Sequence, residues 1–102
     1  MNLFEALPEL VLDIEASLVR LGRGKVAEQL REAPLTSWSY DEFAQSTYLA
    51  LRESIDASDI GEVISLQEEI GVSLDLDGAG RVMGIDVTGY EEFLARLGKA
   101  QS

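Results

Sequence analysis

A chain of 102 residues, 46% of them hydrophobic, is long enough for one globular domain and too apolar for a disordered segment. Its 19 acidic and 8 basic residues give a formal net charge of −11, which argues against nucleic acid and anionic membranes as partners. Without cysteine or histidine the chain cannot build disulfides, or zinc sites from thiolates and imidazoles. No segment has the length of a membrane span, and acids stand where a secretory signal carries bases, so we expect a cytoplasmic protein.

The first segment has the apolar spacing of a helix. Large apolar residues recur in steps of three and four, which places them on one helical face. They are Phe4, Leu7, Val11, Ile14, Leu18 and Leu21. Asn2 and Glu5 resemble a capping pair, but Pro8 lacks the N–H of an interior helical residue. We therefore expect a helix that either kinks at Pro8 or begins there, and that ends at Gly22.

A second, shorter helix is predicted over Lys25 to Glu32, before Pro34 ends it. Its buried face would hold Val26, Ala27 and Leu30.

From Leu35 the apolar period changes from helical to two, which indicates strands. Trp38 and Tyr40 share one strand face, and a polar turn separates them from a second strand over 46–52. The stretch 53–61 is loop-like, and 63–66 is a candidate short strand.

A hairpin is the clearest prediction in the chain. Apolar residues alternate with polar ones or glycine on both sides of Gly78-Ala79-Gly80, and the alternating residues are Ile70, Val72, Leu74 and Leu76, then Met83, Ile85 and Val87. A two-residue turn at Gly78-Ala79 would set Val72 opposite Ile85 and join the apolar residues on one face.

The last predicted element is an amphipathic helix over Gly89 to Gly98. Thr88 and Glu91 form a capping box, and its apolar stripe is Tyr90, Phe93, Leu94 and Leu97. The fold class is therefore α+β: two N-terminal helices, a small antiparallel β-meander sheet of four to five strands, and a C-terminal helix. We expect one domain over 1–102, with a helical segment 1–35, a sheet 36–88 and the helix 89–98.

Several short motifs resemble the domain-of-unknown-function family numbered 2283, over roughly residues 38–90. They are Tyr40-Asp41-Glu42, Thr47-Tyr48-Leu49, Glu68-Glu69, Leu74-Asp75-Leu76-Asp77 and Gly80-Arg81-Val82-Met83-Gly84-Ile85-Asp86-Val87. The sequence departs from the family at Gln45-Ser46-Thr47, where aspartate-alanine-leucine is usual, and at Asp86, where glutamate is usual. The resemblance implies a compact antiparallel sheet of the kind found in small bacterial proteins. It implies no activity, and residues 1–35 lie outside it.

The candidate chemistry rests on three acids. Asp75, Asp77 and Asp86, with a glycine between them, partly match the spacing of a calcium loop, but Ala79 occupies one ligand position and the flanks are predicted strands rather than helices. Asp75 and Asp77 would also share one strand face as a carboxylate pair for acid–base work. We expect instead a hairpin that uses Asp and Gly for its turn, with no metal, no cofactor and no catalytic site.

The functional hypothesis is a non-enzymatic protein-interaction module that self-associates. The apolar stripe from Phe4 to Leu21 is larger than one small sheet face can cover beside a C-terminal helix, so we expect this stripe to form a homodimer interface. The first alternative is an acidic partner of a basic protein, of the antitoxin, immunity or inhibitor type. The second alternative is a small carboxylate-dependent hydrolase.

Overall fold

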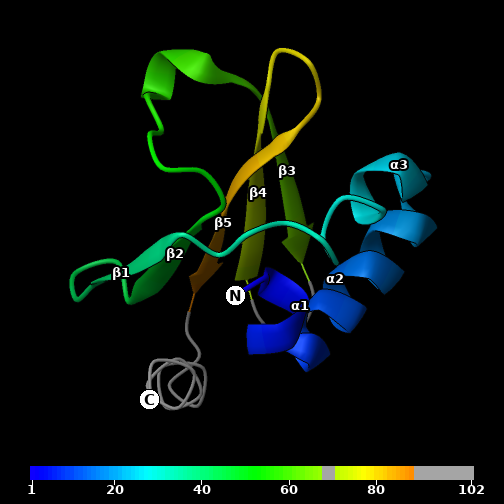
Figure 1. The fold of residues 1–102 in the computed structure, drawn as a ribbon, viewed down its shortest axis with the longest axis horizontal. Helices are drawn as coiled ribbons and strands as arrows, with labels where there is room; N and C mark the ends of the chain where they lie inside the picture. The colour runs from blue at the N-terminus through cyan, green and yellow to red at the C-terminus, as the bar shows by residue number, and fades with distance from the viewer. Residues whose placement is uncertain (68–70, 89–102) are drawn as a thin grey trace.

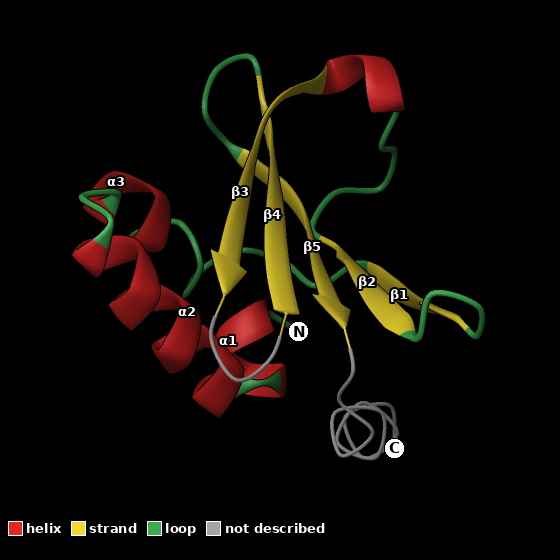
Figure 2. Cartoon of the chain, turned by 180° about the vertical axis from the view of Figure 1, so that it is seen from behind, coloured by secondary structure: helices red, strands yellow, loops and turns green. Residues whose placement is uncertain are grey.

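The computed structural model describes residues 1–67 and 71–88, and these confirm the α+β class. Short helices pack on a five-stranded antiparallel sheet (Figures 1 and 2). The predicted helix over Gly89 to Gly98 and residue Ile70 lie outside the described residues. In chain order the elements are α1 Leu3–Ala6, α2 Pro8–Arg20, α3 Gly24–Ala27, β1 Ser37–Asp41, β2 Ser46–Ala50, a 3₁₀ turn η1 Ala57–Asp59, β3 Ile60–Gln67, β4 Gly71–Asp77 and β5 Val82–Thr88.

The first helical segment is broken in the way that proline predicts. The side chain of Asn2 caps α1 by accepting a hydrogen bond from the Glu5 backbone N–H at 2.8 Å. Helix α1 ends at Ala6, and Pro8 is the first residue of α2, where its missing N–H costs nothing. At the other end Gly22 adopts φ +76°, and the Arg23 N–H donates to the Leu18 carbonyl at 2.8 Å, a Schellman motif that ends α2.

The second predicted helix is shorter than expected. Helix α3 covers only Gly24–Ala27, and the chain continues through turns closed by hydrogen bonds from Gln29 N–H to Val26 and from Leu30 N–H to Ala27. These contacts span three residues, so the chain tightens instead of continuing as an α-helix. The predicted burial of Val26, Ala27 and Leu30 is confirmed.

The sheet is not a simple meander, because its strand order is β1-β2-β5-β4-β3. After β2 the chain crosses to the far edge through η1 and returns by β4 to place β5 in the centre (Figure 1). Strand β2 pairs with β5, with Thr47 opposite Val87 and Leu49 opposite Ile85. The hairpin β1–β2 and the three-stranded meander β3–β4–β5 are thus joined by one pairing between residues distant in sequence.

The predicted register of the β4–β5 hairpin is wrong by two residues, although the predicted faces are right. Val72 lies opposite Val87 and Leu74 opposite Ile85, with Met83 as an extra residue in β5. The turn has three residues rather than two, and Gly80 takes φ +82° at its end. A three-residue turn of this kind needs a left-handed residue at that point, which glycine supplies without strain.

The core lies between the helices and one face of the sheet. Its fully buried side chains come from both layers and include Leu3, Val11, Ile14, Leu18, Leu30, Leu49, Leu74, Leu76, Met83 and Ile85. A bidentate ion pair from Arg23 to Glu62, at 2.7 and 2.8 Å, also connects the helices to edge strand β3. In the described part of the chain, no helix combines the length and the apolar character needed to cross a membrane.

Candidate functional site

The predicted interface stripe lies mostly inside the protein. Leu7, Val11, Ile14 and Leu18 are buried in the chain's own core. Phe4 is partly buried, and Leu21, which caps the end of α2, remains exposed. The expectation that this stripe stays open for a partner is therefore wrong. Burying four such side chains against the sheet stabilises the domain by about 1.5–3 kcal/mol each, which explains why the stripe faces inwards.

Helix α2 carries a second apolar stripe on its outside. Pro8, Leu12, Ala16 and Val19 are spaced by four, four and three residues, so they form one row along the helix. We call this row the outer strip. All four residues are exposed, with 47% of Leu12 and 63% of Val19 accessible. Apolar side chains aligned along the solvent side of a helix, two of them large here, are a feature of binding surfaces.

Charged residues border the outer strip on both sides. Glu9, Asp13 and Arg20 lie along one side, which we call the charged flank; all three are exposed. Arg20 donates a hydrogen bond to Ser17 Oγ at 3.1 Å. On the other side Glu15 forms an ion pair with Arg31 at 3.1 Å. An apolar row with a polar rim is the usual anatomy of an interface.

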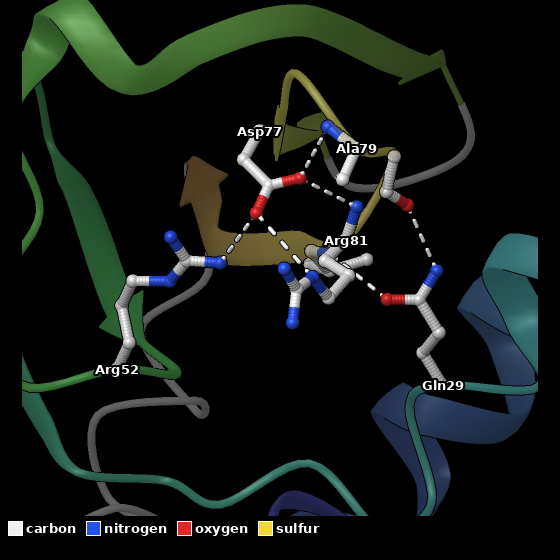
Figure 3. Close-up of polar contacts among 7 residues, drawn as sticks. Gln29, Arg52, Asp77, Ala79 and Arg81 are labelled. Carbon is white, nitrogen blue, oxygen red and sulfur yellow. Dashed lines mark hydrogen bonds and ion pairs between the residues drawn. The ribbon is translucent and has the colours of Figure 1, made fainter.

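The three candidate metal ligands lie on a β-hairpin rather than on a calcium loop. Asp75 and Asp77 are in β4 and Asp86 is in β5. The Asp77 side chain points into the hairpin turn, where its Oδ1 accepts hydrogen bonds from the Ala79 and Arg81 N–H groups at 2.9 Å each (Figure 3). Among residues 1–67 and 71–88, no group of three or more His, Cys, Asp or Glu residues is arranged to hold a metal ion.

The surroundings of Asp77 stabilise its charged form. The Arg81 N–H and the Arg52 guanidinium, which donates to Oδ2 at 2.9 Å, lower the pKa of Asp77 to about 2. Arg81 adds a longer ion pair at 3.7 Å. An acid catalyst needs a raised pKa instead. Asp77 therefore closes the turn as a charged carboxylate.

The hairpin turn is also bound from the helical side. The side-chain amide of Gln29 donates to the Gly80 carbonyl and accepts from the Val82 N–H, both at 2.9 Å (Figure 3). Together these bonds satisfy two backbone groups of the turn with one side chain. Nothing in the local pattern around Gln29 predicts this contact, because its partners are more than fifty residues away.

Tyr48 and Asp75 form a polar contact across the outer sheet face. The Tyr48 hydroxyl donates to Asp75 Oδ2 at 2.9 Å. To reach Asp75, the ring passes over Gly84, where an added Cβ would overlap Tyr48 Oη and Cζ. Burial, followed by the hydrogen bond to Asp75, raises the pKa of the Tyr48 hydroxyl well above its usual value. Gly84 therefore makes room for the Tyr48 side chain.

Asp86 is the least satisfied acid of this face. Its Oδ1 atom is buried and has no hydrogen-bond partner within the described residues. Burial raises the pKa of Asp86, the negative charges of Asp75 and Asp41 add to that shift, and a hydrogen bond with Ser46 opposes it. With Asp75 nearby, Asp86 gives the outer face of the sheet an acidic centre.

Comparison with known proteins adds no relative. No protein-family model, no curated protein and no solved structure matches this chain. The resemblance to the family numbered 2283 therefore stays a prediction, and the function has to be argued from the residues of this chain.

The outer strip could have been found in the sequence. Its spacing of four, four and three residues is as regular as that of the buried stripe, and both stripes lie on the same helix. The buried stripe gives the stronger signal because it contains more large apolar residues. The pairings of Tyr48 with Asp75 and of Arg52 with Asp77 depend on the strand order, and the sequence offers no signal for them.

Proposed function

We propose that this chain is a non-enzymatic protein-interaction module that binds its partner through the outer strip of α2. The observation that carries this proposal is the exposed apolar row itself. Leu12 and Val19 lie on the solvent side of a helix whose opposite face is already buried in the core. Covering each of them would gain about 25 cal/mol per Å² of apolar surface, and folding alone leaves this gain unused.

Site-specific photocrosslinking in the producing cell tests this proposal. A photoreactive phenylalanine analogue at position 12 or 19 should give a covalent protein adduct, because these side chains would face the partner. Ser58 in η1 is the matched control position, since it is exposed and lies on a different element. Adducts of equal yield from all three positions, or none from 12 and 19, would remove the basis for the proposal.

The non-enzymatic part has its own measurement. Phosphatase, esterase, glycosidase and nuclease substrates should show no turnover above buffer. A co-purifying activity that disappears in Asp75→Asn or Asp86→Asn would instead support the carboxylate-dependent hydrolase.

A second candidate function is binding of a basic protein by the acidic outer face of the sheet. The observation that favours it is the group of acids on this face, where the negative charges of Asp75 and Asp41 raise the pKa of Asp86 and an incoming Lys or Arg side chain would offset their repulsion. Such binding would be steered by charge and would weaken as salt rises. A captured basic partner whose affinity falls in Asp86→Asn but not in Leu12→Glu would favour this face over the outer strip.

A further inference from the structure

We infer that the outer strip of α2 binds a second copy of this chain, with the two α2 helices packed antiparallel about a twofold axis. This inference rests on the proposed function and names its partner. Two properties of the strip lead to it: the symmetric placement of its large side chains and the order of charges on its flank. A third property, its small size, limits the strength of the association.

The large side chains are placed to meet their own copies. In an antiparallel helix pair centred between residues 15 and 16, Leu12 of one copy lies level with Val19 of the other, and the reverse contact is identical. Ala16 lies nearest the twofold axis in this arrangement. Its small side chain allows the helix axes to approach closely at the crossing point, with the larger side chains interdigitating on either side.

The charged flank is self-complementary in the same arrangement. The twofold axis brings the charged flanks of both copies to the same side of the interface. Arg20 then lies between Asp13 and Glu9 of the second copy, about 3 Å along the axis from the level of each. A parallel pair would instead bring the charged flank of each copy to the Glu15 side of the other, with Asp13 about 3 Å along the axis from the level of Glu15. The charged flank therefore favours the antiparallel pair.

The small size of the strip limits the strength of the pair. A helix of 13 residues is about 20 Å long, and four side chains on it cover less than the roughly 800 Å² per partner of a standard interface. A contact of this size is typical of a weak, reversible association. We therefore expect a monomer–dimer equilibrium that shifts with concentration, not a permanent dimer.

Sedimentation equilibrium on the purified chain, from about 10 μM to about 1 mM, is the first test. The apparent mass should rise from the 11.1 kDa of one chain towards twice that value. Leu12→Glu and Val19→Glu should each weaken dimerisation by about tenfold or more, because a carboxylate would be buried in the strip. Leu21→Glu is the matched control: Leu21 is exposed and apolar but lies off the strip, so this change should leave the equilibrium within about twofold.

Mixing two charge variants tests the antiparallel pairing itself. Arg20→Glu alone and Asp13→Arg alone should each dimerise more weakly, since each variant sets like charges against each other. An equimolar mixture of the two should recover dimers, because Glu at position 20 of one variant meets Arg at position 13 of the other, while the remaining pair stays native. Recovery in the mixture cannot come from a change in folding, and circular dichroism of each variant checks the fold independently.

The outcomes separate this inference from the proposed function. A chain that stays monomeric at the highest concentration, or a mixture that fails to recover dimers, would overturn the second copy as partner. If photocrosslinks from positions 12 and 19 then appear at the mass of another protein, the interaction module stands with a different occupant. If no crosslinks form at either position, both proposals fail together.

Discussion

The effect of Gly84→Ala on the free energy of unfolding should depend on the residue at position 48. The substitution should destabilise the native protein and stabilise a variant that lacks the Tyr48 ring. In the native protein an added Cβ would overlap the end of the Tyr48 side chain and would lie 2.8 Å from Cε1, so the ring has to move away. Its movement breaks the hydrogen bond from the Tyr48 hydroxyl to Asp75. Loss of a hydrogen bond to a charged group costs about 1.5–3 kcal/mol. Alanine restricts the unfolded chain more than glycine does, which raises the free energy of unfolding by about 0.5–1 kcal/mol. We therefore expect a net decrease in the free energy of unfolding of about 1–2 kcal/mol.

In a Tyr48→Ala background the same substitution should stabilise the protein. The three heavy atoms nearest to the added Cβ all belong to Tyr48, so truncating Tyr48 removes the overlap, and Gly84 does not have a positive φ that would strain alanine. The gain of about 0.5–1 kcal/mol then remains. The coupling between positions 48 and 84 should therefore be about 1.5–3 kcal/mol.

Urea unfolding followed by the fluorescence of Trp38 and by circular dichroism measures all four proteins of this cycle. Trp38 is the single tryptophan and is partly buried against the core, so it reports on unfolding. A Gly84→Ala substitution that destabilises both backgrounds by the same amount would show that the Tyr48 ring does not cross Gly84.

Two further predictions follow from the acids. Because the pKa of Asp77 is lowered to about 2 from its usual 3.8, its contribution to stability is present above pH 3.8 and is lost as the pH falls towards 2. The urea midpoint of the native protein should fall across that range, and Asp77→Asn should flatten this part of the profile; parallel profiles would contradict the turn geometry. Because the pKa of Asp86 is raised, its ionised form costs stability at neutral pH, and the cost fades as the pH falls through the raised pKa. Asp86→Asn should therefore raise the urea midpoint at pH 7 by more than at pH 4, and an unchanged or lower midpoint at pH 7 would refute this.

The hairpin shows which part of the fold the sequence could predict. Alternation of apolar residues with period two correctly assigned Val72, Leu74 and Ile85 to the buried face. The same alternation cannot distinguish registers that differ by two residues, because an even shift keeps every side chain on its face. The register is set by a turn that is one residue longer than predicted, together with the extra residue Met83 in β5. The turn is held by the hydrogen bonds that the Asp77 carboxylate accepts from the Ala79 and Arg81 N–H groups.

The helices show the complementary limit. The start of α2 at Pro8 and its end before Gly22 can be predicted from the sequence, because each follows from the backbone properties of one residue type. Whether the sheet is wide enough to cover the larger apolar stripe of α2 depends on the pairing of β2 with β5. No local pattern encodes a pairing between strands so distant in sequence. The stripe predicted as the interface is therefore the one that the core covers, and the interface that we propose lies on the other face of the same helix.

The strand order also sets the sequence of events during folding. The hairpin β1–β2 and the meander β3–β4–β5 each contain only contacts between neighbours along the chain, so each can form early. The seam between them pairs residues 46–50 with 84–88, and closing the long loop between these segments costs entropy before any contact is gained. During synthesis, the edge of β2 that pairs with β5 therefore stays unpaired until β5 has left the ribosome. Mutations that weaken β5 should lengthen this waiting period and increase aggregation of the nascent chain, even where the finished protein tolerates them.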